Sequence, residues 1–176
     1  MITKYESFFS DEVCVELDNL INKITSKQNA DIPLYTTSIH SWGDGLISHS
    51  TPILRYFIPI EYDNLITKIK KEIFNKTKYE IDNVLIHFWP KLSYITWHND
   101  SGYKGALTIY LNKKWDSNWG GYLMYEENNE IKAIKPEYNL GILQENGVSH
   151  CVSTINVNAD VRISIQVFLN KTKKML

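Results

Sequence analysis

Turn residues divide the second half of the chain into short segments, and this spacing constrains the fold more than any other feature of the sequence. After residue 80, turns are predicted at 99–103, 112–121, 128–129, 136–139 and 145–147. Strands that follow one another at intervals of about eight to twelve residues are typical of a sandwich or a barrel. The segment 160–169 is the clearest strand, because apolar and polar side chains alternate along its whole length.

Helical patterns occur in the first eighty residues. Ser10 precedes two acidic residues in the manner of a helix N-cap, and apolar residues then recur at helical spacing, which predicts a helix over 11–26. An apolar stripe of the same period predicts a second helix over 62–75. Both stripes indicate packing against a core.

The length and composition of the chain suit one compact domain. It has 176 residues, of which 43% are hydrophobic, and this is enough to bury a full core. The sequence contains no internal repeat. We therefore expect a single domain over 1–176, with a helical part at about 1–80 and a β-rich core at about 81–170.

Two histidines and one aspartate form a candidate metal site. A strand over 92–98 that stays extended to Asp100 would point the side chains of His98 and Asp100 to the same side. His150 lies in another short predicted strand, 148–152, and must approach from a distant part of the fold. Two imidazoles and one carboxylate are the ligand set that holds non-haem Fe(II) and leaves coordination positions open.

Arg162 is one of only two arginines among nineteen basic residues. Alternation places it on one face of its strand with Ser164, Gln166 and Phe168. A guanidinium on such an inward face is costly to bury unless it is paired, and a carboxylate held by two hydrogen bonds is its best geometric partner. The sequence therefore indicates a metal site that also grips a carboxylate co-substrate.

Six segments of the chain carry a resemblance to a known family: 94–100, 107–112, 119–123, 140–143, 149–150 and 162–164. Together they resemble the Fe(II)/2-oxoglutarate-dependent oxygenases, in particular the small prolyl-4-hydroxylase-like branch. The resemblance implies a mainly β fold, the double-stranded β-helix or jelly roll, buttressed by the N-terminal α-helices. It also implies that His98, Asp100 and His150 are the metal ligands and catalytic residues.

The same resemblance implies roles in co-substrate binding. Arg162, helped by Ser164, would bind the distal carboxylate of 2-oxoglutarate. Many prolyl hydroxylases use lysine at this step, so the arginine departs from that branch. A tyrosine often contacts the co-substrate as well, and the candidates are Tyr94 and Tyr110, with Trp89 as a weaker third.

The implied reaction is hydroxylation of a C–H bond, with decarboxylation of 2-oxoglutarate to succinate. It uses Fe(II), 2-oxoglutarate and O₂, with ascorbate in support. Related halogenases have a small residue in place of the carboxylate ligand, so the presence of Asp100 favours hydroxylation. The first hypothesis for the substrate is a prolyl residue in a peptide or protein. A free amino acid or other small metabolite remains open, as does a jelly-roll binding module with a vestigial or structural metal site.

The remaining features have simpler interpretations. His87, on the same strand face as Trp89, is expected to be structural, with a place in the pocket wall as the alternative. The Gly- and Ser-rich stretch 41–48 is expected to be a loop, either a solvated turn or part of a mobile lid over 36–52 with Trp42 as an apolar contact. The two cysteines give no disulfide framework, which suits a reducing compartment. The net charge of −1 indicates no nucleic-acid footprint, and no apolar run has membrane-spanning length. Without a recognisable signal peptide, a cytoplasmic location is expected.

Overall fold

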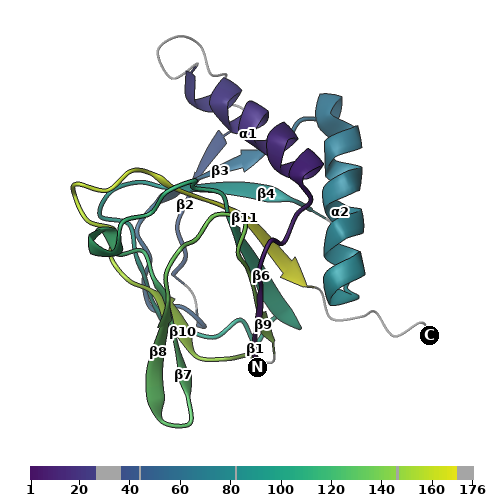
Figure 1. The fold of residues 1–176 in the computed structure, drawn as a ribbon. Helices are drawn as coiled ribbons and strands as arrows, with labels where there is room; N and C mark the ends of the chain where they lie inside the picture. The colour runs from purple at the N-terminus through teal and green to yellow at the C-terminus, as the bar shows by residue number, and fades with distance from the viewer. Residues whose placement is uncertain (27–36, 44, 82, 146, 170–176) are drawn as a thin grey trace.

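The computed structural model describes residues 1–26, 37–43, 45–81, 83–145 and 147–169. Within these residues the chain forms eleven β-strands and two α-helices in three layers: the helices, a larger sheet and a smaller sheet (Figure 1). The mainly β jelly roll buttressed by helices, which the resemblance implies, is confirmed.

The larger sheet has seven antiparallel strands in the order β1-β9-β6-β11-β4-β3-β2. Their bounds are Ile2–Tyr5 (β1), Gly141–Glu145 (β9), Gly105–Tyr110 (β6), Arg162–Leu169 (β11), Leu85–Trp89 (β4), Ile53–Phe57 (β3) and Thr37–His40 (β2). The smaller sheet has the order β5-β10-β7-β8, with bounds Ile95–His98 (β5), His150–Val152 (β10), Leu123–Glu127 (β7) and Glu130–Ile134 (β8).

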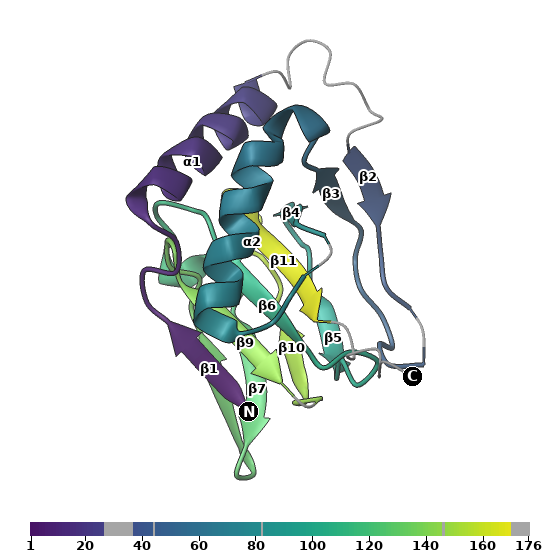
Figure 2. The ribbon, with the colours of Figure 1, turned by 90° about the vertical axis from the view of Figure 1, so that its right-hand side faces the viewer.

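Three strands of the larger sheet come from the part of the chain that the sequence predicts as helical. Strand β1 pairs with β9 at one edge, and β2 and β3 extend the opposite edge (Figure 2). Strand β2 ends directly before 41–48, the stretch that the sequence predicts as a loop. Each of these strands has only four or five residues, which is too short for alternation to be recognised without its partners.

Both predicted helices are confirmed, as α1 over Asp11–Ser26 and α2 over Asp63–Thr77. They cover the outer face of the larger sheet (Figure 2). Between helices and sheet lies the main hydrophobic core, where Leu17, Ile69 and Ile86 are almost fully buried. No helix in the described part of the chain is long and apolar enough to cross a membrane.

Strand β11 runs through the middle of the larger sheet and has two different faces. Ile165 and Val167 point into the core beneath the helices. Arg162, Gln166 and Phe168 point the other way and line a pocket between the two sheets. The alternation predicted for 160–169 therefore holds, and it determines which side chains the smaller sheet encloses.

Candidate metal centre and pocket

His98, Asp100 and His150 come together at the smaller sheet. One potential ligand atom from each residue lies within 4.8 Å of the others. His98 ends β5 and His150 begins β10, and the two residues are direct partners in the antiparallel register. Asp100 follows β5 by two residues, and its Oδ2 lies 3.5 Å from Nε2 of His150. The pattern of a His-x-Asp pair and a distant histidine thus converges on one point.

Backbone oxygens orient both imidazoles. Nδ1 of His98 lies 2.7 Å from the carbonyl oxygen of Thr96, and Nδ1 of His150 lies 2.7 Å from that of Val148. When Nδ1 donates to a carbonyl, Nε2 is left as the basic nitrogen, which is the usual arrangement of metal-bound histidines. Burial and the neighbouring His98 lower the pKa of His150, which favours the neutral, metal-binding form. The donor set therefore fits a divalent transition metal such as Fe(II).

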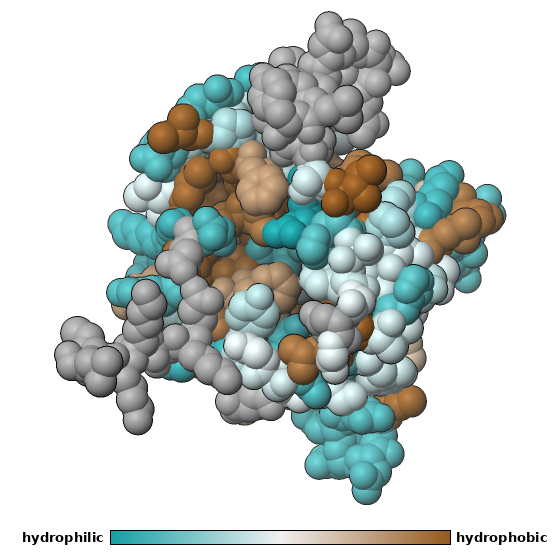
Figure 3. Space-filling model, turned by 180° about the vertical axis from the view of Figure 1, so that it is seen from behind, coloured by the Kyte–Doolittle hydropathy of each residue, from teal (hydrophilic) through white to brown (hydrophobic). Residues whose placement is uncertain are grey.

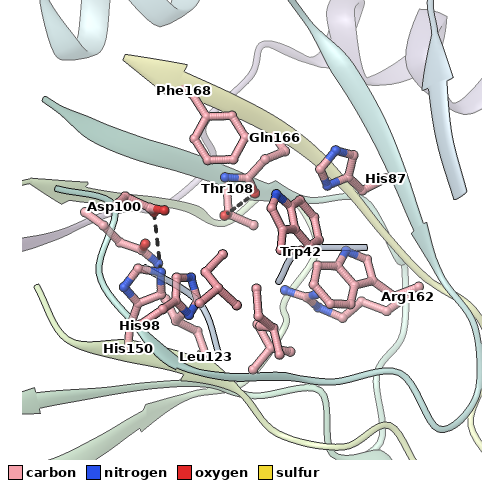
Figure 4. A pocket seen from close by; sticks show the side chains of 15 residues that line it. Trp42, His87, His98, Asp100, Thr108, Leu123, His150, Arg162, Gln166 and Phe168 are labelled. Carbon is pink, nitrogen blue, oxygen red and sulfur yellow. Dashed lines mark hydrogen bonds and ion pairs between the residues drawn. The ribbon is translucent and has the colours of Figure 1, made fainter. Parts of the chain in front are cut away.

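The three residues lie at one end of the pocket, and Arg162 lies at the other (Figure 4). Between them the wall combines apolar side chains, including Trp89 and Leu123, with a polar side made by Thr108 and Gln166. The Thr108 hydroxyl donates a hydrogen bond to Oε1 of Gln166 at 2.7 Å, so these two polar side chains bond to each other.

Arg162 is 2% exposed, and its Nε and Nη1 have no hydrogen-bond partner. The guanidinium lies between two aromatic rings, 5.0 Å from the Trp89 centroid and 4.9 Å from the Tyr110 centroid. The hydroxyls of Tyr110 and Ser164 are likewise buried without a partner. Burying a cation with unmet donors is strongly unfavourable, so the arrangement is incomplete without an anion.

A carboxylate fits this arrangement of donors. Two guanidinium N–H groups match its two oxygens, and the two hydroxyls can add hydrogen bonds from the side. Arg162, Ser164 and Tyr110 all belong to neighbouring strands, because Ser164 pairs with Tyr110 across β11 and β6. The residues present therefore fit a ligand that has a carboxylate at the Arg162 end of the pocket, such as 2-oxoglutarate.

Tyr94 lies outside this arrangement. Its ring is 5.6 Å from that of His49, and its backbone bonds to Thr51. Among the described residues that line the pocket, Tyr94 does not occur. A role for Tyr94 in co-substrate binding gains no support from this position and stays a prediction.

His87 lines the pocket, which is the alternative that the sequence leaves open beside a structural role. It is 1% exposed, and neither ring nitrogen has a hydrogen-bond partner. Burial, together with smaller contributions from Arg55, His40 and Arg162, lowers its pKa to about 3. The alternation of β4 could have indicated this position, because His87 is two residues from Trp89 and shares its face.

Trp42 covers part of the pocket from the segment after β2. Its indole stacks on Trp89, with centroids 6.1 Å apart, and tilts against His87 at 5.9 Å. Further along this segment, Ile47 and Ser50 form isolated β-bridges with residues of β5. These bridges attach the segment to the smaller sheet. The prediction of an apolar contact from Trp42 is consistent with this place in the wall.

Trp115 and Trp119 have a packing role. Their rings meet edge to face at 5.2 Å in a hydrophobic cluster that shares Trp89 and Ile95 with the pocket wall. Cys14 and Cys151 are both buried and free. Cys151 is not part of the metal-ligand group, although it directly follows His150.

Residues 85–170 match the family model of the 2OG-Fe(II) oxygenase superfamily. None of the curated proteins matches the sequence significantly. Solved structures show the same fold. A prolyl-4-hydroxylase from Pseudomonas putida aligns with a TM-score of 0.62 and 14% identity, covering 97% of this chain and 92% of that one.

Two other similar structures contain a bound molecule, a peptide in one and 2-oxoglutarate in the other. A prolyl hydroxylase from Trichoplax adhaerens, in complex with a peptide fragment of the hypoxia inducible factor oxygen degradation domain, has a TM-score of 0.64 and 17% identity, with coverage of 96% and 83%. The viral collagen prolyl hydroxylase of Paramecium bursaria Chlorella virus-1, in complex with 2-oxoglutarate, has a TM-score of 0.60 and 18% identity, with coverage of 98% and 96%. The predicted resemblance to the 2OG-Fe(II) oxygenases is confirmed over 85–170, and the chain shares the fold of these prolyl hydroxylases.

Proposed function

We propose that this protein is an enzyme. The chain has the fold of the 2OG-Fe(II) oxygenases, and residues 85–170 match the family model of that superfamily. It is a dioxygenase that depends on Fe(II) and 2-oxoglutarate and hydroxylates a C–H bond. Its substrate is a prolyl residue in a peptide or protein, and 2-oxoglutarate is decarboxylated to succinate.

The observation that carries the proposal is the pairing of two features across one pocket. His98, Asp100 and His150 can hold a metal at one end, and the buried Arg162 lacks an anion at the other. A dicarboxylate with a keto group next to one carboxylate meets both needs at once. A purely structural metal site would leave the unpartnered guanidinium without a role.

The protein's residues have three tasks in this reaction. His98, Asp100 and His150 hold Fe(II), which supplies open coordination positions for the keto acid and O₂. Arg162, Ser164 and Tyr110 bind and orient the distal carboxylate. Apolar side chains of the wall, Trp42 among them, exclude water and thereby strengthen the electrostatic grip of Arg162.

A prolyl substrate is supported by the likeness to structures of prolyl hydroxylases, one of which holds a peptide. The alternative substrate is a free amino acid or other small metabolite. The pocket supports this alternative through polar side chains deep in its wall, such as His87, that a small ligand could reach.

The test is succinate formation by anaerobically purified protein that is then given Fe(II), ascorbate, 2-oxoglutarate and O₂, with and without proline-containing peptides. Stimulation of succinate by a peptide, with hydroxyproline in the product, is the expected result. His98→Ala should abolish the signal, and Cys151→Ser is the matched control, because Cys151 is adjacent to a ligand but outside the metal group.

Other outcomes have distinct meanings. Slow succinate formation that peptides leave unchanged would keep the oxygenase and redirect the search to small molecules. Binding of Fe(II) without binding of 2-oxoglutarate, and with no succinate, would contradict the enzyme and favour a jelly-roll binding module.

A further inference from the structure

Arg55 and His87 form a second polar cluster beside the pocket. They are direct partners in the register of β3 and β4, so their side chains lie on the same face of the larger sheet. His87 in turn pairs with Ser164 on β11. The row Arg55, His87, Ser164 therefore crosses the sheet from β3, the strand next to the edge strand β2, to β11 at the pocket.

The polar atoms of this cluster lack partners. Both ring nitrogens of His87 and Nε of Arg55 are buried without a hydrogen bond. Arg55 forms no ion pair with any described residue, and its guanidinium lies over the ring of Phe57, 5.6 Å from the ring centroid. A ring that is 1% exposed and still unpartnered points to a ligand group that the protein itself does not supply.

The charged groups that act on His87 are the guanidiniums of Arg55 and Arg162, whereas burial lowers the pKa of His40 and favours its neutral form. Among the described residues, the groups acting on Arg55 include no carboxylate. Neutral imidazole offers one N–H donor, and the guanidinium offers several. Such a site attracts an anion that can accept hydrogen bonds.

This site is distinct from the one that suits the distal carboxylate of 2-oxoglutarate. Arg55 lies on β3 and Arg162 on β11, with β4 between them, so the two backbones are separated by two strand spacings, roughly 10 Å. The co-substrate has two carboxylates, one for the metal end and one for Arg162. Neither remains for Arg55.

We propose that Arg55 and His87 bind a carboxylate of the molecule that is hydroxylated. The inference rests on the proposed function and narrows its substrate class to one that carries a carboxylate. This group is an α-carboxylate of a free amino acid, a peptide C-terminus or an acidic side chain next to the reacting residue. Trp42, which contacts His87, and the half-exposed Phe57 supply apolar surface for the rest of such a substrate.

Figure 3 shows that the face opposite to that of Figure 1 has apolar side chains next to hydrophilic ones. Phe57, a half-exposed residue of β3, lies two residues from Arg55 and therefore on the same face of the sheet. A substrate anchored at Arg55 therefore has both a charged and an apolar surface to contact before it reaches the metal end.

The experiment compares matched pairs of probes that differ only in one carboxylate. The pairs are free L-amino acids, including proline, against their amides, peptides that end in proline as acid and as amide, and peptides with glutamate or glutamine beside an internal proline. Binding is followed by tryptophan fluorescence, since Trp42 contacts His87, with Zn²⁺ and 2-oxoglutarate present and O₂ excluded. Succinate formation with Fe(II) and O₂ is measured in parallel.

The expected result is that at least one acid binds roughly 10- to 100-fold more tightly than its uncharged counterpart, because a charge-assisted hydrogen bond is lost. Arg55→Gln should weaken binding of the acid by a similar factor and leave binding of the uncharged probe nearly unchanged. Arg55→Lys should retain part of the affinity for the acid. His87→Gln, which keeps an N–H donor, should bind the acid better than His87→Leu. Lys71→Gln on the exposed side of α2 controls for net charge.

Three outcomes would overturn the inference. The wild-type protein could bind acids and their uncharged counterparts with equal affinity, or bind no acid at all. Alternatively, Arg55→Gln could reduce the affinity for both kinds of probe by the same factor. Succinate formation without an acid preference would refute this subsite alone. Absence of succinate under all conditions would refute the proposed function, and the fluorescence titration would still decide whether the cluster binds carboxylates.

Discussion

His98 and His150 face each other across β5 and β10, with ring centroids 4.1 Å apart. Fifty-two positions separate them in the sequence, and the antiparallel register makes them direct neighbours. The backbone pairing, and not a contact between the rings, holds the two side chains at the same point. A substitution at either position therefore removes a ligand while the strands keep their pairing.

We predict that alanine in place of His98, Asp100 or His150 abolishes 2-oxoglutarate turnover and weakens metal binding by more than about 100-fold. Loss of a partner that merely orients a ligand already costs about 10- to 100-fold, and loss of the ligand itself costs more. Calorimetric titration with Fe(II) or Mn²⁺ under anaerobic conditions measures the affinity. An alanine variant that still bound metal with wild-type affinity would remove that residue from the ligand set.

Arg162→Ala should raise the concentration of 2-oxoglutarate required for half-maximal turnover by roughly 10- to 100-fold, because it removes a charge-assisted pair. Arg162→Lys should give a smaller defect, since lysine keeps the charge but cannot make the two-pronged contact. The check is a 2-oxoglutarate titration of succinate formation. Unchanged affinity in Arg162→Ala would contradict the assignment of Arg162.

Replacing Arg162 by an apolar residue should increase the stability of the protein when the co-substrate is absent. Arg162 is almost fully buried with two unpartnered nitrogens. Replacing buried charged groups by apolar side chains of similar size stabilises some proteins by about 1–4 kcal/mol. We therefore expect Arg162→Met to raise the free energy of unfolding in urea when 2-oxoglutarate is absent, and to lose the stabilisation that 2-oxoglutarate gives the wild type. A less stable Arg162→Met protein would indicate that the guanidinium is better satisfied than its contacts suggest.

His87 should make stability depend on pH. Burial lowers its pKa to about 3, well below the value of about 6.5 in the unfolded chain. Between these values the unfolded chain binds more protons than the folded one, so stability falls as the pH decreases below 6.5. From pH 7 to pH 4.5 this one group should cost about 2 kcal/mol. Urea unfolding of wild type and His87→Leu at both pH values measures the difference, and parallel pH dependence in the two proteins would contradict it.

Gly141 marks where the N-terminal segment packs on the larger sheet. A Cβ at this position would lie 2.1 Å from Cδ2 of Phe8, which is fully buried and cannot move aside. We expect Gly141→Ala to lower the free energy of unfolding by about 1–3 kcal/mol, as overpacking of a core does. Gly43→Ala is the control, because nothing lies within 4 Å of its Cβ, and it should change stability by less than about 0.5 kcal/mol. Equal unfolding midpoints for the two variants would show that Phe8 can adjust.

Parts of the site were predictable because they depend on short-range geometry. The alternation of β11 placed Arg162 and Gln166 on one face, and the structure has both in the pocket wall. Other parts depend on which strands become neighbours. Tyr94 and Tyr110 were equivalent candidates in the sequence, but only Tyr110 lies against Arg162, because β6 pairs with β11.

The sequence by itself determined the two helices, the β-rich second half and the residues able to bind metal and carboxylate. The helices and the β-rich half follow from the periodicity of neighbouring residues. The capacity to bind metal and carboxylate follows from the chemistry of single side chains. Only the tertiary structure decided that β2 and β3 extend the larger sheet, and that Arg55 thereby lies beside His87. Strand pairing joins residues that are far apart in the chain, and short strands carry too little local pattern to reveal their partners.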